Sequence, residues 1–312
     1  IRRQRQMCIR DRVMYSLYCR DVLHKVVEEK GIVVFVSMEI MLDNLPTYAG
    51  GLGLLAGDAL LSAADLGYPM MGVTLLYDHG YVYHEVRDGR IIDLSEPYEP
   101  VEHHKKLDMK LRIELESGQV YLGVWRHNLR GKNGDIVPIY LLDSNVPENP
   151  SHLRGLTSRV YIENSIEERL LKELILSLGA LKLVERLGLP VRKYHINESH
   201  PGFLAIELLK RYGDIERVRR EIVFTTHTPL IHGHEEYEYG LVENHYDVPV
   251  EVKNMSPDKL KLTPIMMRLA GYYNCVSWKF HRVHTKMFPG FEPDFITNGI
   301  HHERWTHHWI QE

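Results

Sequence analysis

Short runs of apolar, often β-branched residues recur along the first half of the chain and predict strands of a buried sheet. The segments GIVVFVSME (residues 31–39) and YPMMGVTLLY (residues 68–77) each have the compact apolar character of such a strand. Between residues 105 and 143, apolar and polar residues alternate in three segments that Gly and Asn separate. This period of two residues predicts an antiparallel patch.

The pattern becomes helical between residues 158 and 187, where apolar residues recur at steps of three and four. A strand at 193–196, a helix at 200–213 and a strand at 221–226 follow, and DFIT (residues 294–297) predicts one more strand. Strands and helices of these lengths form parallel units with right-handed crossovers. We therefore predict one α/β domain with an antiparallel β insertion, undivided by any repeat or linker.

Four glycines lie within eight residues at the start of an apolar, helix-prone stretch: Gly50, Gly51, Gly53 and Gly57. The segment from Gly51 fits the loose dinucleotide pattern G-x-G-x-x-G/A. The preceding predicted strand ends some ten residues earlier, however, and no acidic residue follows at the required distance. We therefore favour a general property instead: a glycine loop that opens a helix presents amides and a positive dipole end to an anion such as phosphate.

Polar side chains follow three of the predicted parallel strands. Because ligands bind beyond the carboxyl ends of such strands, these residues are expected at one rim of the sheet. They are Asn197, Glu198, Ser199 and His200 after the first, His227, Thr228 and Pro229 after the second, and Asn298 and Gly299 after the last. For Ser199 and Thr228 alone, helix capping is the favoured interpretation, with Pro201 in the first helical turn. For Glu198, His200, His227 and Asn298 we favour a shared polar pocket.

Composition excludes several classes of protein. Of the 312 residues, 44% are hydrophobic and 26% charged, as in ordinary globular proteins. A net charge of −4 argues against a nucleic-acid partner held by phosphate contacts, and no apolar run reaches the roughly 20 residues of a membrane span. The three cysteines (Cys8, Cys19 and Cys275) are too few and too scattered for a disulfide framework, which favours a reducing compartment.

The first twelve residues, IRRQRQMCIRDR, are rich in arginine and lack an initiator Met at position 1. We interpret residues 1–12 as a non-native leader that resembles translated adapter DNA; the alternative is a genuine basic arm. The apolar stretch that follows is short for the core of a signal peptide. Residues 13–312 are expected to form a domain that is cut short at its C-terminal end.

Five separated groups of residues occur in an order that a known family shares. They are FVSMEI with LPTYAGGLGLLAGDALLSAADLGYP, YHINESHPGFLAIELL, FTTHTPLIHGHE, WKFHRVHTKMF and ITNGIHHERW. In this order, from about residue 32 to residue 305, the chain resembles the α-glucan phosphorylases, the family of glycogen, starch and maltodextrin phosphorylases.

The resemblance implies the GT-B fold, in which two Rossmann-like domains face each other across a cleft, and it implies that this chain is the N-terminal one. The implied reaction transfers a terminal α-1,4-linked glucosyl unit of a glucan or maltodextrin to phosphate, giving α-D-glucose 1-phosphate with retention. The implied cofactor is pyridoxal 5′-phosphate. Its lysine, and the residues that grip the substrate phosphate, belong to the family's C-terminal domain, so we expect no cofactor-binding residue here and no activity from this chain alone.

The resemblance also implies roles for particular residues. Gly50 and Gly51 correspond to the loop at the substrate phosphate and glucose. Asn197, Glu198 and His200 correspond to the Asn-Asp/Glu-x-His segment beside the terminal sugar, with Glu198 where many members have Asp.

His227 corresponds to the histidine that contacts the glucose 6-hydroxyl and whose backbone carbonyl faces the reacting ring, and Asn298 to the asparagine that binds the same hydroxyl. A carbonyl and a nearby carboxylate stabilise an oxocarbenium-like transition state. His227 and Glu198 are therefore the expected catalytic residues. The resemblance also implies that the substrate phosphate acts as the acid, assisted by the cofactor phosphate.

Several alternatives remain open at this stage. Of the nineteen histidines, His232 with His234 and a group at 301, 302, 307 and 308 are the best metal candidates, but the common metal-binding spacings are absent, so we expect no metal. The rival functions are a glycosyltransferase of the same fold, such as a glycogen synthase, and a non-catalytic glucan-binding module. The expected partners are glucan, phosphate and the C-terminal domain, without nucleic acid or membrane; the expected location is the cytoplasm, and a homodimer is left open.

Overall fold

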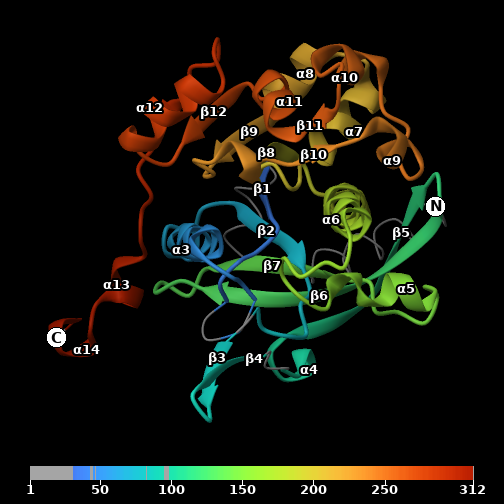
Figure 1. Ribbon diagram of the computed structural model, residues 1–312. Coiled ribbons are helices and arrows are strands. Elements are labelled where there is room, and N and C mark those ends of the chain that lie inside the picture. Colours follow the sequence, from blue (N-terminus) through green and yellow to red (C-terminus); the bar gives the residue numbers. More distant parts are fainter. Residues whose placement is uncertain (1–30, 43–44, 46, 82, 95–97, 312) are drawn as a thin grey trace, which may run out of the picture.

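A nine-stranded sheet runs through the centre of the protein (Figure 1). The computed structural model describes residues 31–42, 45, 47–81, 83–94 and 98–311, so residues 1–12, Cys8 and Cys19 lie outside the described part. The strand order is β13-β12-β9-β8-β1-β2-β7-β6-β5. The strands from β13 to β7 are parallel, and β6 and β5 continue the sheet in the antiparallel sense. Their bounds are β1 (Ile32–Ser37), β2 (Met70–Leu75), β5 (Lys105–Leu115), β6 (Gly118–Arg130), β7 (Ile136–Asp143), β8 (Val191–Asn197), β9 (Ile222–Thr226), β12 (Tyr272–Cys275) and β13 (Asp294–Phe295).

This topology confirms the predicted α/β domain with an antiparallel insertion. The insertion is not a separate layer, because β7 pairs with β2 in parallel and so joins the hairpins to the main sheet. The sequence pattern missed β12, which lies between β9 and β13. Its four residues begin with the partly exposed Tyr272 and Tyr273 and have no β-branched run.

Alternate residues of the strands enter two different cores, because successive side chains of a strand point to opposite faces. In β1, Val34 and Val36 join the larger cluster, whereas Phe35 joins the smaller one. The helix α3 (Gly51–Asp65) covers the smaller cluster and α6 (Ile166–Leu187) the larger, on opposite sides of β1 and β2 (Figure 1). Both faces of the central strands β1, β2 and β7 are therefore buried, as their apolar sequences require.

The long helix begins later than its apolar pattern suggested, at residue 166 rather than 158. Ser165 caps it by accepting a hydrogen bond from the Glu168 amide, and Glu168 in turn accepts one from the Asn164 amide. This reciprocal cap fixes the helix start. The helix ends at Gly188, whose φ of 64° is the left-handed conformation that glycine adopts without strain.

The remaining helices pack around the sheet or follow it in the chain. They are α4 (Pro100–His103), α5 (Ser151–Arg154), α7 (Phe203–Tyr212), α8 (Ile215–Glu221), α9 (Tyr239–Glu243), α10 (Val250–Met255), α11 (Leu262–Leu269), α12 (Trp278–Met287), α13 (His302–Trp305) and α14 (His308–Gln311). Short 3₁₀ turns lie at η1 (Gly155–Thr157) and η2 (Ile231–Gly233). Among the described residues, none of the helices has the length and apolar character needed to cross a bilayer.

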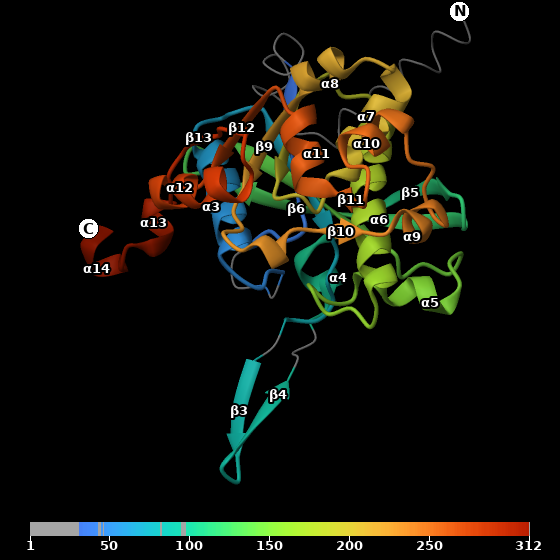
Figure 2. The ribbon, with the colours of Figure 1, turned by 45° about the horizontal axis from the view of Figure 1, so that its top comes forward.

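Two small sheets lie outside the central one. The hairpin of β3 (Tyr83–Arg87) and β4 (Arg90–Leu94) projects away from the body of the domain (Figure 2). The strands β10 (Glu236–Tyr237) and β11 (Leu260–Lys261) pair with each other beside α6. The segment that contains β10 returns the chain toward the carboxyl ends of the central strands.

Candidate active site

A cavity of about 320 Å³ lies at the carboxyl ends of the central strands, next to α3. Its polar lining includes His195 and Asn197 of β8, Thr225 of β9, Asn274 of β12 and Asn298 of the segment after β13. The structure thus brings Asn197 and Asn298 to one cavity, although about a hundred residues separate them. This is the position at which ligands bind to open parallel sheets.

Glu198 follows β8 directly and is held in an unusual backbone conformation. Its φ is 64°, a left-handed value that non-glycine residues seldom adopt and that often marks a functional site. The side chain is buried, and its carboxylate accepts hydrogen bonds from the amides of His227 (2.7 Å) and Thr228 (3.1 Å) and from the Thr228 hydroxyl (3.0 Å). Thr228 therefore bonds to this carboxylate rather than capping a helix.

The electrostatics of Glu198 follow from these donors. Burial raises its pKa, but nearby His227 and His200 and the bond from the His227 amide outweigh burial and hold the pKa below its ordinary value. Glu198 is therefore an ionised group that fastens the loop after β9 to the end of β8.

The contacts of His227 define its tautomer. The Ser37 hydroxyl donates to the Glu39 carbonyl, so its oxygen accepts from Asn197 Nδ2 at 3.0 Å. This orients the Asn197 amide with Oδ1 toward His227 Nε2, 2.8 Å away. His227 Nε2 must then carry the proton and donate, which leaves Nδ1 as an acceptor in the neutral ring. Burial lowers the pKa of His227, and Glu198 offsets this only in part, so the neutral form prevails at pH 7.

His200 lies close to two carboxylates, those of Glu198 and Glu235. Its Nε2 is 3.6 Å from Glu235 Oε1, and its ring contacts the Tyr161 ring at a centroid distance of 5.5 Å. The Tyr161 hydroxyl donates to Glu39 Oε1 at 3.2 Å. Tyr161, like Glu198, has a positive φ, of 51°. His200 therefore connects the Glu198 region with the residues around Glu39.

Glu39 sits at the start of the glycine loop. Its Oε2 accepts hydrogen bonds from the amides of Ala49 (2.5 Å) and Gly50 (3.1 Å). Burial raises the pKa of this carboxyl despite these bonds. The Gly50 amide is therefore already bonded to the Glu39 carboxylate and is not open to a ligand. In the described part of the chain, the Gly51 and Leu52 amides at the start of α3 have no hydrogen-bond partner.

The four glycines divide into two pairs by their surroundings. A Cβ on Gly53 would lie 2.4 Å from Tyr48 Cβ, and one on Gly57 would lie 2.4 Å from the Met41 carbonyl oxygen. Those two glycines are required for close packing of α3 against the segment after β1. A Cβ on Gly50 or Gly51 would meet no described atom within 4 Å. The second pair faces open space at the helix N-terminus.

The predicted site residues lie near one another in two sets, and His200 is close enough to Glu198 to lower its pKa. Contacts connect the glycine loop through Glu39 and Tyr161 to His200, and Glu198 and Asn197 each contact His227. Of the predicted site residues, only Asn197 and Asn298 line the cavity. Ser199 is buried beside Glu198, and Pro201 precedes α7, which begins at residue 203 after an N-cap glycine.

Sequence reasoning missed five residues of this region: Glu39, Tyr161, His195, Thr225 and Asn274. Glu39 is the first charged residue after β1, so the rule that selected Asn197 and His227 would have selected it as well. Asn274 accepts from the Thr225 hydroxyl at 3.0 Å, and Thr225 accepts from His195 Nε2 at 2.8 Å. Burial lowers the pKa of His195 to about 4. Tyr161 lies in an irregular segment and had no sequence signal.

The fold and this cluster define a doubly covered parallel α/β domain with a polar site at the carboxyl ends of its strands. By sequence comparison, the chain is homologous to glycogen and maltodextrin phosphorylases. It is 34% identical to the glycogen phosphorylase of Aquifex aeolicus over 94% of this chain and 47% of that protein. It is 31% identical to the maltodextrin phosphorylase of Thermococcus litoralis over 90% of this chain and 37% of that protein.

A third relative, the glycogen phosphorylase of Mycobacterium tuberculosis H37Rv, is 30% identical over 89% of this chain and 38% of that protein. The chain thus spans less than half the length of these curated relatives. No family model matches it. The homology implies that the domain is the N-terminal half of a GT-B fold.

Proposed function

We propose that this chain is part of an enzyme that cleaves α-1,4-glucan with phosphate and releases α-D-glucose 1-phosphate with retention of configuration. The observation that carries the proposal is the homology to a glycogen phosphorylase over 94% of the chain. The polar group at the carboxyl ends of the strands supports it, because it contains the residues that the resemblance assigns to the site.

We propose that residues 13–312 form the N-terminal domain and that a further domain completes the enzyme. That domain would hold pyridoxal 5′-phosphate, which supplies a phosphate group that assists proton transfer. No residue of this chain is assigned to the cofactor. The chain alone is then inactive, and the expected partners are glucan or maltodextrin, phosphate and the second domain, in the cytoplasm; a homodimer stays open.

Within this chain, His227 is the proposed catalytic residue. Its neutral ring, with a proton on Nε2, leaves Nδ1 to accept a hydrogen bond from a sugar hydroxyl. Its backbone carbonyl would face the oxocarbenium-like carbon of the transition state, where a fixed dipole is stabilising. Asn197 holds the ring, and Asn298, which lines the same cavity as Asn197, would bind the same sugar hydroxyl.

Glu198 acts through His227 in this proposal. The amides of His227 and Thr228 donate to the Glu198 carboxylate. Glu198 therefore fixes the His227 backbone and contributes negative charge near the reacting ring. His200 lies beside it as a substrate-binding residue. The Gly50–Gly51 turn would receive the glucose and phosphate, since the open Gly51 and Leu52 amides stand at the positive end of α3.

The experiment uses the gene product extended in frame through its second domain. Incubation with maltodextrin and phosphate should release glucose 1-phosphate, and release should stop without phosphate. His227→Ala should lower kcat more than it weakens maltodextrin binding, whereas His152→Ala, an exposed histidine on α5, should change neither. An unchanged kcat with weaker binding would remove the catalytic role of His227.

The same protein separates the rival functions. Glucosyl transfer from a sugar nucleotide without phosphorolysis would favour a synthase of the same fold. Retention on starch without turnover would favour a glucan-binding module.

A further inference from the structure

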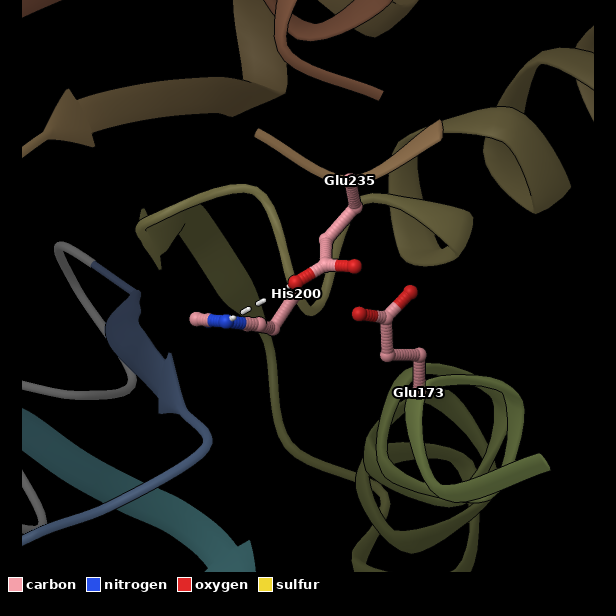
Figure 3. Close-up of side chains that lie close together, drawn as sticks. All are labelled: Glu173, His200 and Glu235. Carbon is pink, nitrogen blue, oxygen red and sulfur yellow. Dashed lines mark ion pairs between the residues drawn. The ribbon is translucent and has the colours of Figure 1, made fainter. Parts of the chain in front are cut away.

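Three side chains from three separate elements lie close together (Figure 3). Glu173 comes from α6, His200 from the loop after β8, and Glu235 from the segment between η2 and β10. One nitrogen or oxygen atom of each lies within 4.8 Å of the other two. Figure 3 shows the Glu173 carboxylate directed toward that of Glu235, with the His200 ring on the other side of Glu235.

Glu173 has no partner that accounts for its burial. The residue is fully buried, and neither carboxylate oxygen has a hydrogen-bond partner among the described residues. The nearby Tyr237 hydroxyl lowers the pKa of Glu173, and the same hydroxyl lies 3.5 Å from Glu235 Oε2, so the two carboxylates share one weak donor. Burial, reinforced by Glu235, nevertheless raises the pKa of Glu173 well above its ordinary value. A buried carboxylate in this position needs a positive ligand or a proton.

The spacing of the three groups suits a metal ion better than direct hydrogen bonds. A tetrahedral ion with bonds of about 2.1 Å separates its ligand atoms by about 3.4 Å. His200 Nε2 and Glu235 Oε1 are already 3.6 Å apart, too far for a good hydrogen bond. His200 Nδ1 is also buried without a partner in the described part of the chain. The widest separation, up to 4.8 Å, would have to close by rotation of the glutamate side chains when the ion binds.

The charges around the cluster permit a divalent cation. Two carboxylates and a neutral imidazole balance a charge of +2. Arg169 forms an ion pair with Glu235 at 3.5 Å and another with Glu163 at 3.6 Å. Because the Arg169 side chain is 45% exposed, it can move away from Glu235 when an ion binds and remain paired with Glu163. Lys172 is already committed to Glu163 at 2.9 Å.

We propose that Glu173, His200 and Glu235 bind a divalent transition-metal ion of the Zn²⁺ type, which fastens the loops after β8 and β9 to α6. One imidazole and two carboxylates are donors that such ions accept, and water would complete the coordination. The site goes beyond the proposed function but shares His200 with it, so the test substitutes Glu173 and Glu235, which have no role in the proposed reaction. No spacing in the sequence indicates this site, because its ligands are 27 and 35 residues apart, at positions 173, 200 and 235.

The test is Zn²⁺ binding by the 312-residue chain after treatment with a chelator. We expect one tightly bound equivalent by elemental analysis and a rise in Tm on adding Zn²⁺. Glu173→Gln and Glu235→Gln should each weaken this binding at least about 100-fold. Glu236→Gln is the matched control, because Glu236 is adjacent to Glu235 but exposed and paired with Lys261.

Folding of each variant is checked by circular dichroism without metal. Glutamine at position 173 fills the same volume without a buried charge, so this variant should stay folded. Visible absorption of a Co²⁺-substituted protein gives a second readout, and the spectrum of the wild type should change in both ligand variants. The proposal is overturned if the wild type retains no equivalent of Zn²⁺, or if Glu173→Gln and Glu235→Gln bind it as the control does. A metal-free protein in which Glu173 shares a proton with Glu235 would give the first of these results.

Discussion

At the scale of single residues, the buried charge of Glu198 connects stability with the geometry of the candidate site. Its carboxylate accepts hydrogen bonds from five donors on residues 199 and 226–228. Each oxygen accepts at least two of them, so an amide NH₂ group in place of either oxygen would face donors. The loop that carries His227 depends on this acceptor.

We predict that Glu198→Gln lowers the free energy of unfolding by about 2–4 kcal/mol at pH 7. The folded-state pKa of Glu198 lies below its ordinary value of 4.5, so the wild type has this stability above pH 4.5 and loses it as the pH falls through the folded-state pKa. Urea denaturation measures the effect. The exposed Glu238→Gln is the control, and equal stability of the two variants would contradict the interpretation.

His284 gives a second pH-dependent prediction. Its side chain is fully buried among Tyr273, Phe280 and Phe288, and burial lowers its pKa to about 4. The unfolded chain binds a proton near pH 6.5, so the folded state loses stability as the pH falls below that value toward 4. At pH 5 the loss is about 2 kcal/mol.

The free energy of unfolding of the wild type falls between pH 7 and pH 5, and we expect this fall to be about 2 kcal/mol smaller in His284→Phe. Urea titrations at the two pH values measure the drop. His232→Phe, on the exposed turn η2, should leave it unchanged. If both variants follow the wild type, His284 does not contribute to the acid sensitivity.

At the scale of elements, the glycines at the start of α3 have different roles: Gly57 is needed for packing, and Gly51 belongs to the proposed substrate loop. Gly57 meets the Met41 carbonyl, whereas Gly51 faces open space in the first turn of the helix. We predict that Gly57→Ala destabilises the chain by at least about 2 kcal/mol, because a Cβ has no room there. Gly51→Ala should be neutral or stabilise by up to about 1 kcal/mol.

The functional half of this prediction uses the extended enzyme. There, Gly51→Ala should lower kcat/KM for phosphorolysis even though it does not destabilise the protein. Unfolding curves and initial rates on the same preparations make the comparison. An unaltered kcat/KM would remove Gly51 from the substrate loop, and loss of stability would show that the helix start is packed.

The elements also show which structural features the sequence could predict. β1, β2 and β9 were predictable because buried parallel strands require apolar runs, and the helical period located α6. In β8 only the part at 193–196 was predicted, since Arg192 and Lys193 interrupt its apolar pattern. The start of α6 was not predictable, since the cap at Ser165 decides it and the apolar period does not. β12 carries no such run; pairing with β9 and β13 makes it a strand.

The same division applies to the candidate site. Asn197, His227 and Asn298 could be selected because the carboxyl ends of parallel strands meet at one edge. The packing of Tyr161 against His200, and the meeting of Glu173 with Glu235, depend on how α6 and the loop after η2 pack in three dimensions. No local pattern encodes those contacts.

At the scale of the whole molecule, apolar side chains gather on the segment that follows β13. The exposed ones include Ile296, Ile300, Trp305 and Trp309. Contacts with α3 hold part of this segment in place: Asp58 accepts from Arg304 at 2.8 Å and from the Trp305 indole at 2.6 Å. An apolar surface fixed in this way is typical of an interface.

We predict that the second domain covers this surface in the extended enzyme, since the homologous phosphorylases are more than twice as long as this chain. Burial removes apolar side chains from water and so stabilises the association of the two domains. Carbene footprinting of the chain alone and of the extended protein measures the change. Labelling of residues 296–309 should fall several-fold, while that of the exposed Val250 on α10 serves as the internal control. Equal labelling of this segment in both proteins would mean that the second domain docks elsewhere, and the cavity beside α3 would then lack its facing wall.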